Sequence, residues 1–267
     1  MSGLFFSSAL VFYLVGLFHS LIAFTAKRDF FFRIATTSVG VGFAFHTGFL
    51  IPRNLETSHF PLVGLRESLA FFAWTVSLCF LLSNLRYRIR ALGIFCLPLV
   101  TVLMLGTTII KASPIPAILQ SSWIYLHTTF LFLAYAMFFV TFVAGLLYLF
   151  QERELKKKQL KTFYHQLPSL RSLDELFSHF LISGFTFMTL GLLAGVIWAE
   201  QDWVHGWQRD PKVIAALVTW GIYLVLLYLR LTVGLRGKRA TVISLAGFIS
   251  VLFTFLGSSY LGGLHKF

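Results

Sequence analysis

Charged residues are scarce in this chain: they make up 12% of its 267 residues, while 57% are hydrophobic. A soluble globular domain carries about 25% charged residues and about 45–50% apolar ones. The balance therefore excludes an ordinary soluble domain. Together with a mean hydropathy of +0.81, it predicts an all-α, polytopic integral membrane protein.

Cysteine is also scarce, and its placement excludes several kinds of site. The two cysteines, Cys79 and Cys96, fall inside apolar runs. This placement is typical of small core residues rather than of a disulfide, a thiol redox pair or a metal site. The sequence has no glycine-rich phosphate loop and no nucleophile elbow, so it lacks a self-contained catalytic constellation.

Long apolar runs dominate what is there. A transmembrane helix needs about 20 residues, and eight runs approach or exceed that length. We place them at residues 3–25, 31–51, 67–84, 91–111, 119–150, 176–198, 212–233 and 240–262. The fifth is longer than a bilayer requires, so we expect it to tilt or to project into water. The runs predict a single membrane domain over residues 1–267, with both termini on the same side.

The 22 lysines and arginines are divided unevenly between alternate connections. Sixteen of them fall on one side, six of these in the loop 151–175. The positive-inside rule places that side in the cytoplasm, so both termini are predicted to face outward. The formal net charge of +12 is then a signal of topology and of contact with anionic lipid. We do not expect nucleic-acid binding.

The cytoplasmic loop 151–175 contains signals for helix ends. Helix-forming charges over residues 152–158 predict that the fifth helix continues into the loop. The residues Leu167-Pro168-Ser169-Leu170 break it. Ser172, followed three residues later by Glu175, predicts a capping box at the start of the sixth helix.

An aromatic, charged segment at residues 198–212 separates the sixth and seventh runs, and we predict an outer loop there. Three of the six tryptophans lie in it: Trp198, Trp203 and Trp207. Rigid indoles offer area for a flat, apolar ligand, and nearby charges can orient its polar edge. An aromatic belt at the membrane interface is the alternative explanation of the same residues.

Five of the eight histidines gather in the outer half of the predicted topology: His46, His59, His127, His205 and His265. Ionisable residues near a membrane core are costly, so they are candidates for function. Imidazoles beside stacking aromatics suit axial ligation of a haem iron. A zinc site would need closer histidine spacing, and any one histidine can instead be a hydrogen-bonded packing residue.

Several motifs then match a known family in order and spacing. The central set is Trp203, Trp207, Asp210, Pro211, Lys212, Ala216, Leu217, Thr219 and Trp220. Further matches are His59 to Leu62 with Glu67 to Leu69 and Trp74, then Trp123, His127 and Tyr135, and finally Gly263-Leu264-His265. The central set resembles the "WWD" segment of the cytochrome c assembly family. That family includes the CcsA-type haem-handling subunit of system II cytochrome c synthases and the smaller HemX-type proteins.

The resemblance implies a role for each matching residue. His127 and His265 take the positions of two external histidines that ligate haem iron. His46 takes the position of a transmembrane histidine that serves an internal haem site. The aromatics of the segment, among them Trp203 and Trp207, would hold the haem for presentation.

The chain also departs from the family pattern. The second transmembrane histidine of the family falls at Tyr228, and tyrosine ligates haem iron in some proteins. Arg209 stands where the family has its third tryptophan, while Asp210 and Lys212 are retained. We expect Arg209 and Lys212 to pair with the haem propionates.

These patterns predict a membrane protein of cytochrome c maturation that holds or presents haem b at the outer face. The alternative is a HemX-type regulatory protein of tetrapyrrole synthesis, which the short chain and Tyr228 favour. The partners implied are haem, apocytochrome c, a second synthase subunit and the lipid bilayer. The expected location is a bacterial-type cytoplasmic membrane, and any enzymatic role is at most that of a haem-handling synthase subunit.

Overall fold

The computed structural model describes residues 2–26, 28–57, 64–110, 121–156, 167–202 and 207–257. These residues form eight long helices, two short helical turns and no strand. The elements are α1 (Ser2–Ala26), α2 (Asp29–Thr57), α3 (Leu65–Arg86), α4 (Arg90–Ile109), α5 (Ser122–Lys156), α6 (Leu170–Asp202), η3 (Trp207–Arg209), α7 (Pro211–Thr232), α8 (Gly237–Leu252) and η4 (Phe253–Gly257). All eight α-helices are long and apolar enough to cross a membrane, if the last turn of α8 is included. This confirms the predicted all-α, polytopic fold.

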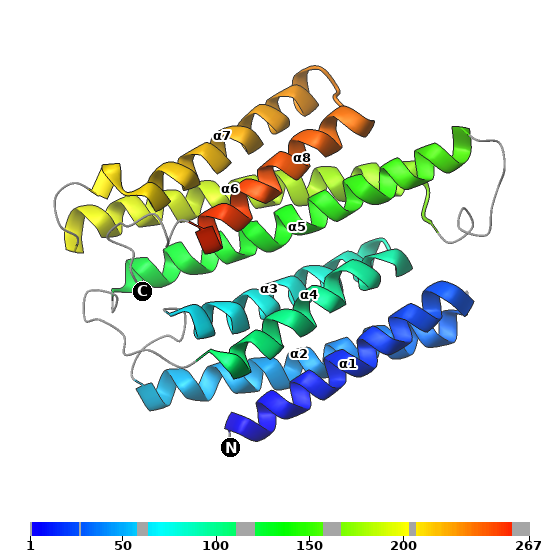
Figure 1. Cartoon of the computed structure of the whole chain (residues 1–267), viewed down its shortest axis with the longest axis horizontal. Coiled ribbons are helices and arrows are strands. Elements are labelled where there is room, and N and C mark those ends of the chain that lie inside the picture. The colour runs from blue at the N-terminus through cyan, green and yellow to red at the C-terminus, as the bar shows by residue number, and fades with distance from the viewer. Residues whose placement is uncertain are drawn as a thin grey trace. The chain divides into compact units, whose positions relative to one another are not determined.

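The chain divides into two compact units. Unit 1 comprises Met1–Ala112 and Phe150–Leu173, and unit 2 comprises Ser113–Leu149 and Asp174–Phe267. Within each unit, consecutive long helices run in opposite directions (Figure 1). The single membrane domain predicted over residues 1–267 stays a prediction.

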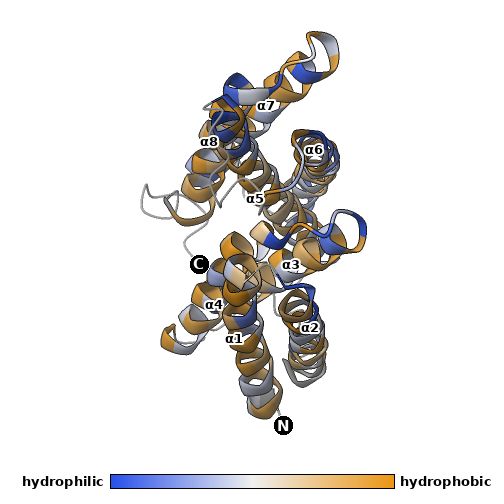
Figure 2. Ribbon diagram, turned by 90° about the vertical axis from the view of Figure 1, so that its right-hand side faces the viewer, coloured by the Kyte–Doolittle hydropathy of each residue, from blue (hydrophilic) through white to orange (hydrophobic). Residues whose placement is uncertain are grey.

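The outer faces of the helices are apolar, as a lipid environment requires. Along α7, for example, Ile214, Leu217 and Val218 are each about half exposed. Figure 2 shows hydrophobic residues predominating along the helices and hydrophilic ones mainly near their ends and connections. Lipid removes the cost of this exposure, because its tails are as apolar as the side chains.

Unit 1 is built by α1 packing against α2 and α4, and by α3 packing against the same two helices. A close approach of α1 to α2 depends on Gly42, because a Cβ there would lie 3.1 Å from the ring of Tyr13. Cys79 and Cys96 are both buried and free, which confirms that they are core residues.

Unit 2 is held together by aromatic and hydroxyl contacts between its helices. Phe138 of α5 stacks on Tyr223 of α7, with ring centroids 3.5 Å apart. The hydroxyl of Thr241 in α8 donates to the carbonyl of Gly145 in α5 over 3.2 Å. The indole N–H of Trp220 in α7 donates to a threonine hydroxyl of α6 over 3.0 Å. Small side chains and hydroxyls of this kind are the usual means of helix association in membranes.

The helix ends around the predicted cytoplasmic loop confirm one expectation and correct another. Helix α5 continues to Lys156, whose ammonium lies 2.9 Å from a carboxylate oxygen of Glu152, so the predicted extension is present. The capping box predicted at Ser172 is wrong. The hydroxyl of Ser169 accepts the backbone N–H of Ser172 over 3.2 Å. Ser169 therefore caps α6 one turn earlier, and Ser172 lies inside the helix.

The aromatic segment 198–212 is more helical than the predicted outer loop. Helix α6 continues to Asp202, and α7 already begins at Pro211. The side chain of Asp210 accepts the backbone N–H of Lys212 over 2.9 Å, and Pro211 follows at the first helical position. Both features are typical of a strong helix start.

Candidate functional site

His127 lies near the start of α5 and makes one defined hydrogen bond. Its Nδ1 is 2.8 Å from the carbonyl oxygen of Gly191 in α6. A carbonyl only accepts, so Nδ1 must carry a hydrogen, and in the neutral imidazole Nε2 then keeps its lone pair. A backbone carbonyl that orients one nitrogen while the other stays available is the arrangement found in metal-ligating histidines.

The place of the His127 ring depends on a second glycine of α6. A Cβ built on Gly195 would lie 2.4 Å from Nδ1 of His127, much closer than side chains tolerate. Gly191 and Gly195 are four residues apart, so they share one face of the helix. These glycines leave that face of α6 without side chains, so the ring of His127 can lie against the helix.

The ring of His127 borders a cavity of about 170 Å³ within unit 2. Aliphatic side chains of α5, α6 and α7 form most of its wall, together with Trp198 and Trp207. Tyr135, Lys212 and Thr254 are its other polar residues. The cavity thus offers an apolar lining, one imidazole and one cation.

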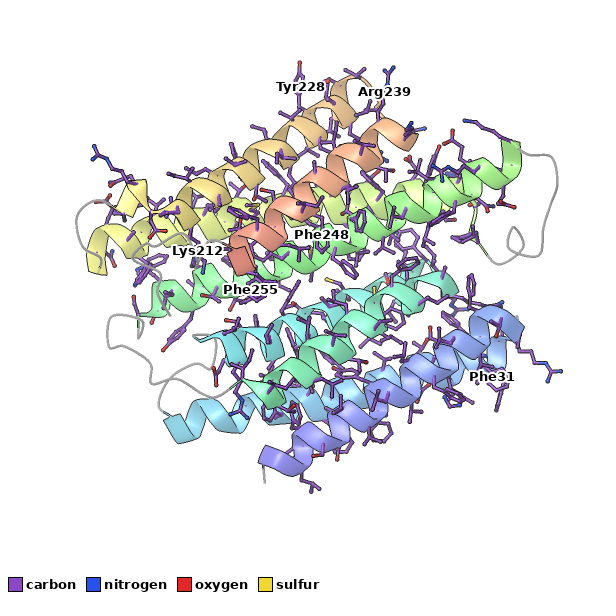
Figure 3. The ribbon with its side chains drawn as sticks, in the orientation of Figure 1. Phe31, Lys212, Tyr228, Arg239, Phe248 and Phe255 are labelled. Atoms are coloured by element: carbon purple, nitrogen blue, oxygen red, sulfur yellow. The ribbon has the colours of Figure 1, made fainter. Side chains whose placement is uncertain are left out.

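Lys212 reaches this cavity because Asp210 and Pro211 start α7 beside it. Asp210 is only 4% exposed and holds the backbone of Lys212 through its carboxylate. Figure 3 shows Lys212 and Phe255 at one end of unit 2, while Tyr228 and Arg239 project from α7 and α8 at the other end. The predicted haem contact Lys212 and the predicted ligand His127 therefore line the same space.

The remaining residues of the aromatic segment are placed differently. Trp207 lies in the turn η3, lines the cavity and donates its indole N–H to Glu200 over 3.1 Å. Arg209, in the same turn, is exposed and is not part of the cavity wall. Trp203 and His265 lie outside the described residues.

The two residues predicted for the internal haem site lie in different units. His46, in unit 1, is fully buried, and its Nδ1 is 3.1 Å from the hydroxyl of Tyr13. Its Nε2 has no hydrogen-bond partner among the described residues. Tyr228, in unit 2, is 62% exposed and points away from its helix bundle (Figure 3). The internal site stays a prediction.

Sequence reasoning missed several residues of the cavity wall, including Gly195 and Thr254, whereas Trp198 belongs to the aromatic segment singled out above. A signal for Gly195 was present, since Gly191-Leu192-Leu193-Ala194-Gly195 is a small-residue pattern typical of close helix packing in membranes. No comparable signal marks Thr254, which the π-helical turn η4 carries. The described residues contain no group of three or more His, Cys, Asp or Glu side chains that could hold a metal ion.

A family model described as "Cytochrome C assembly protein" matches residues 62–265 of the chain. The chain belongs to the cytochrome c assembly family. Curated members of this family are similar over most of its length. A cytochrome c biogenesis protein CcsA of Chlorella vulgaris is 32% identical over 92% of this chain and 89% of that protein. The CcsA of Prochlorococcus marinus is 30% identical over 97% and 92%.

Other members of the cytochrome c assembly family are longer than this chain. It is 32% identical to the CcsA of Chlamydomonas reinhardtii but spans only 64% of that protein's length. A solved structure, the cytochrome c haem lyase CcmF, matches 98% of this chain and 51% of its own, with a TM-score of 0.66 and 17% identity. At that identity the match shows a common fold.

Proposed function

We propose that this chain binds haem in the cavity beside His127 and presents it for cytochrome c maturation. One observation carries the proposal: His127 has its Nδ1 committed to the carbonyl of Gly191 and its Nε2 free for a metal at an apolar cavity. Membership in the cytochrome c assembly family supports the role in maturation. Haem is here a cargo, and we expect haem b.

The neighbouring residues suit different parts of a haem. We propose His127 and His265 as the two iron ligands, and Trp203 and Trp207 as packing surfaces for the macrocycle. Lys212 is a cation at the edge of the apolar wall and suits a propionate. Arg209 lies in the turn η3, three residues before Lys212, and is exposed. We assign it to the second propionate, which requires the haem to extend out of the cavity.

The chemistry of attachment comes from the other components. Cysteine thiols of an apocytochrome c would add to the vinyl groups of the haem, and a Cys-x-x-Cys-His segment provides them. The chain's own contribution is to hold the haem, to orient it and to protect its iron. We propose a second synthase subunit as partner, because the chain is similar to CcsA proteins and resembles the haem-handling subunit of system II synthases.

The side of the membrane follows from the distribution of charge. The basic connections are predicted to be cytoplasmic, and the segment around Trp207 is predicted to lie on the opposite side. We therefore propose that the site opens on the outer face of a bacterial-type cytoplasmic membrane. Haem delivered there would meet apocytochrome c outside the cytoplasm.

The absorption spectrum of the purified protein tests this function. We expect a Soret band in the full chain in mild detergent, and loss of most of it in His127→Ala. A matched control is His19→Ala, because His19 also bonds a backbone carbonyl through Nδ1, that of Val15 over 2.8 Å, but does not line the cavity. Wild-type haem content in His127→Ala would overturn the proposal.

A further inference from the structure

Unit 1 contains a second, larger cavity that the proposed haem site does not use. It encloses about 930 Å³ where α2 begins, α3 ends and α4 begins. Its wall combines charged, amide and apolar groups: Asp29, Arg33, Asn84, Leu85, Arg88 and Arg90. The volume is typical of a small-molecule site, about 300–1,000 Å³.

The charges in this cavity are only partly paired. Arg90 forms an ion pair with Asp29. Arg33 and Arg88 also line the cavity, and neither has an ion-pair partner among the described residues. The cavity therefore has an excess of two positive charges. Arg88 adopts a left-handed backbone conformation with φ of 48° in the short turn between α3 and α4, so the turn itself sets its position.

A buried amide in the wall also lacks hydrogen bonds. Asn84 is 5% exposed, and both its Nδ2 and its Oδ1 are buried without a partner in the described part of the chain. Such groups are rare in folded proteins and call for an explanation. The terminal torsion of asparagine is soft, so the amide can turn toward a polar group in the cavity that the residue lines.

We propose that this cavity binds the phosphate group of an anionic phospholipid. Guanidinium groups recognise phosphate oxygens through paired hydrogen bonds, and the amide of Asn84 suits the ester or hydroxyl oxygens beside a phosphate. Leu85 lines the cavity and is 80% exposed, so an apolar surface continues outward from the charged group. This continuity favours a lipid over free phosphate, and basic pockets between transmembrane helices are known to take lipid head groups.

Lipid binding to the purified full chain tests the proposal. The probes are phosphatidylglycerol, phosphatidylcholine and inorganic phosphate, and the readouts are retained lipid by native mass spectrometry and the thermal unfolding midpoint. We expect phosphatidylglycerol alone to be retained and to raise the midpoint. The double variant Arg33→Gln/Arg88→Gln should lower its affinity roughly tenfold or more.

Two further variants separate the cavity from its surroundings. Arg28→Gln/Arg86→Gln removes the same charge from residues that do not line the cavity, and it should retain the lipid. Asn84→Leu removes the buried amide, so it should fold at least as stably as the parent yet bind phosphatidylglycerol more weakly. A midpoint shift with inorganic phosphate that is lost in the cavity variant would support the site with free phosphate as its ligand. Equal losses in both double variants, or equal retention of phosphatidylcholine, would overturn it.

Discussion

The two ends of unit 2 place a polar side chain among apolar helices in different ways. At one end, the guanidinium of Arg230 donates to Ser178 over 2.9 Å, to the carbonyl of Leu235 over 3.1 Å and to the carboxylate of Asp174 over 2.7 Å. At the other end, His127 uses one ring nitrogen and leaves the second facing a cavity. The hydrogen bonds of Arg230 indicate a structural role, whereas the ring of His127 has one hydrogen bond and borders a cavity, which is why we propose a binding role for it.

The comparison extends to what each group does for its helices. Arg230 joins the start of α6, the end of α7 and the following turn, and it also lies 4.7 Å from the ring centroid of Phe177. His127 has one hydrogen bond, to the carbonyl of Gly191. We expect this bond to determine the tautomer of the ring and to add little to the stability of the fold. Stability and haem binding should therefore respond separately to changes at the two ends.

The largest effect on stability is expected from Arg230→Met. It leaves the carboxylate of Asp174, which is 18% exposed, without its shortest ion pair. Breaking a buried pair on one side costs about 3–5 kcal/mol, while the haem content per folded protein should not change. The free energy of unfolding in detergent and the Soret absorbance measure the two quantities. The control Arg239→Met changes an exposed residue (Figure 3) and should cost less than about 0.5 kcal/mol.

The opposite pattern is expected from Gly195→Ala. The added methyl group would displace the His127 ring, which lies 2.4 Å from the ideal Cβ position. We expect most of the Soret absorbance to be lost, with a cost of about 1–3 kcal/mol from overpacking. Gly221→Ala is the control, since no atom lies within 4 Å of its ideal Cβ. Full haem binding in Gly195→Ala would show that the ring can move without loss of function.

A smaller effect is expected at the start of α6, the helix that carries Asp174. Ser169→Ala should lower the free energy of unfolding by about 1 kcal/mol, because it removes the cap of this helix. Ser172→Ala should cost less, since that residue is already helical. Thermal unfolding of both variants decides the order, and the reverse order would restore the capping box predicted from the sequence.

The smallest effect is expected at Tyr228, near the Arg230 end. Its side chain is 62% exposed and has no hydrogen-bond partner for its hydroxyl among the described residues. Tyr228→Phe should change the free energy of unfolding by less than about 0.5 kcal/mol and leave the haem spectrum unaltered. Tyr228→His should also leave it unaltered. A new six-coordinate, low-spin signal in Tyr228→His would instead support the internal site with His46.

Two of the three predicted haem histidines, His127 and His46, show where sequence reasoning reached its limit. Both were identified as candidates from residue type and family resemblance. His127 bonds a carbonyl, which leaves Nε2 as the free nitrogen, whereas His46 bonds the hydroxyl of Tyr13, which can donate or accept. The tautomer of His127 is thus determined by its partner and that of His46 is not. No pattern in the sequence distinguishes these two environments.

Other outcomes depend on which of two local signals prevails. Ser169 and Ser172 are both acceptable caps, and because Ser169 is the one used, α6 starts one turn earlier than the capping box predicted.

The role of Arg230 was not predicted from the sequence. There it was counted only as one of the basic residues that indicate the cytoplasmic side. In the structure Arg230 forms hydrogen bonds with Asp174 and Ser178, because these two residues of α6 lie beside it. Its position near the end of α7 does not by itself predict these bonds.

The sequence by itself determined the eight helices, their order and the kinds of residue in the candidate site. A helix that crosses lipid must satisfy its own backbone hydrogen bonds and must be apolar over about 20 residues. Both requirements are local, so they can be read along the chain. Only the tertiary structure decided which nitrogen of His127 bonds a carbonyl and that every nitrogen of Arg230 has an acceptor. These depend on partners 64 and 56 residues away, and on a glycine face that lets the imidazole lie against α6.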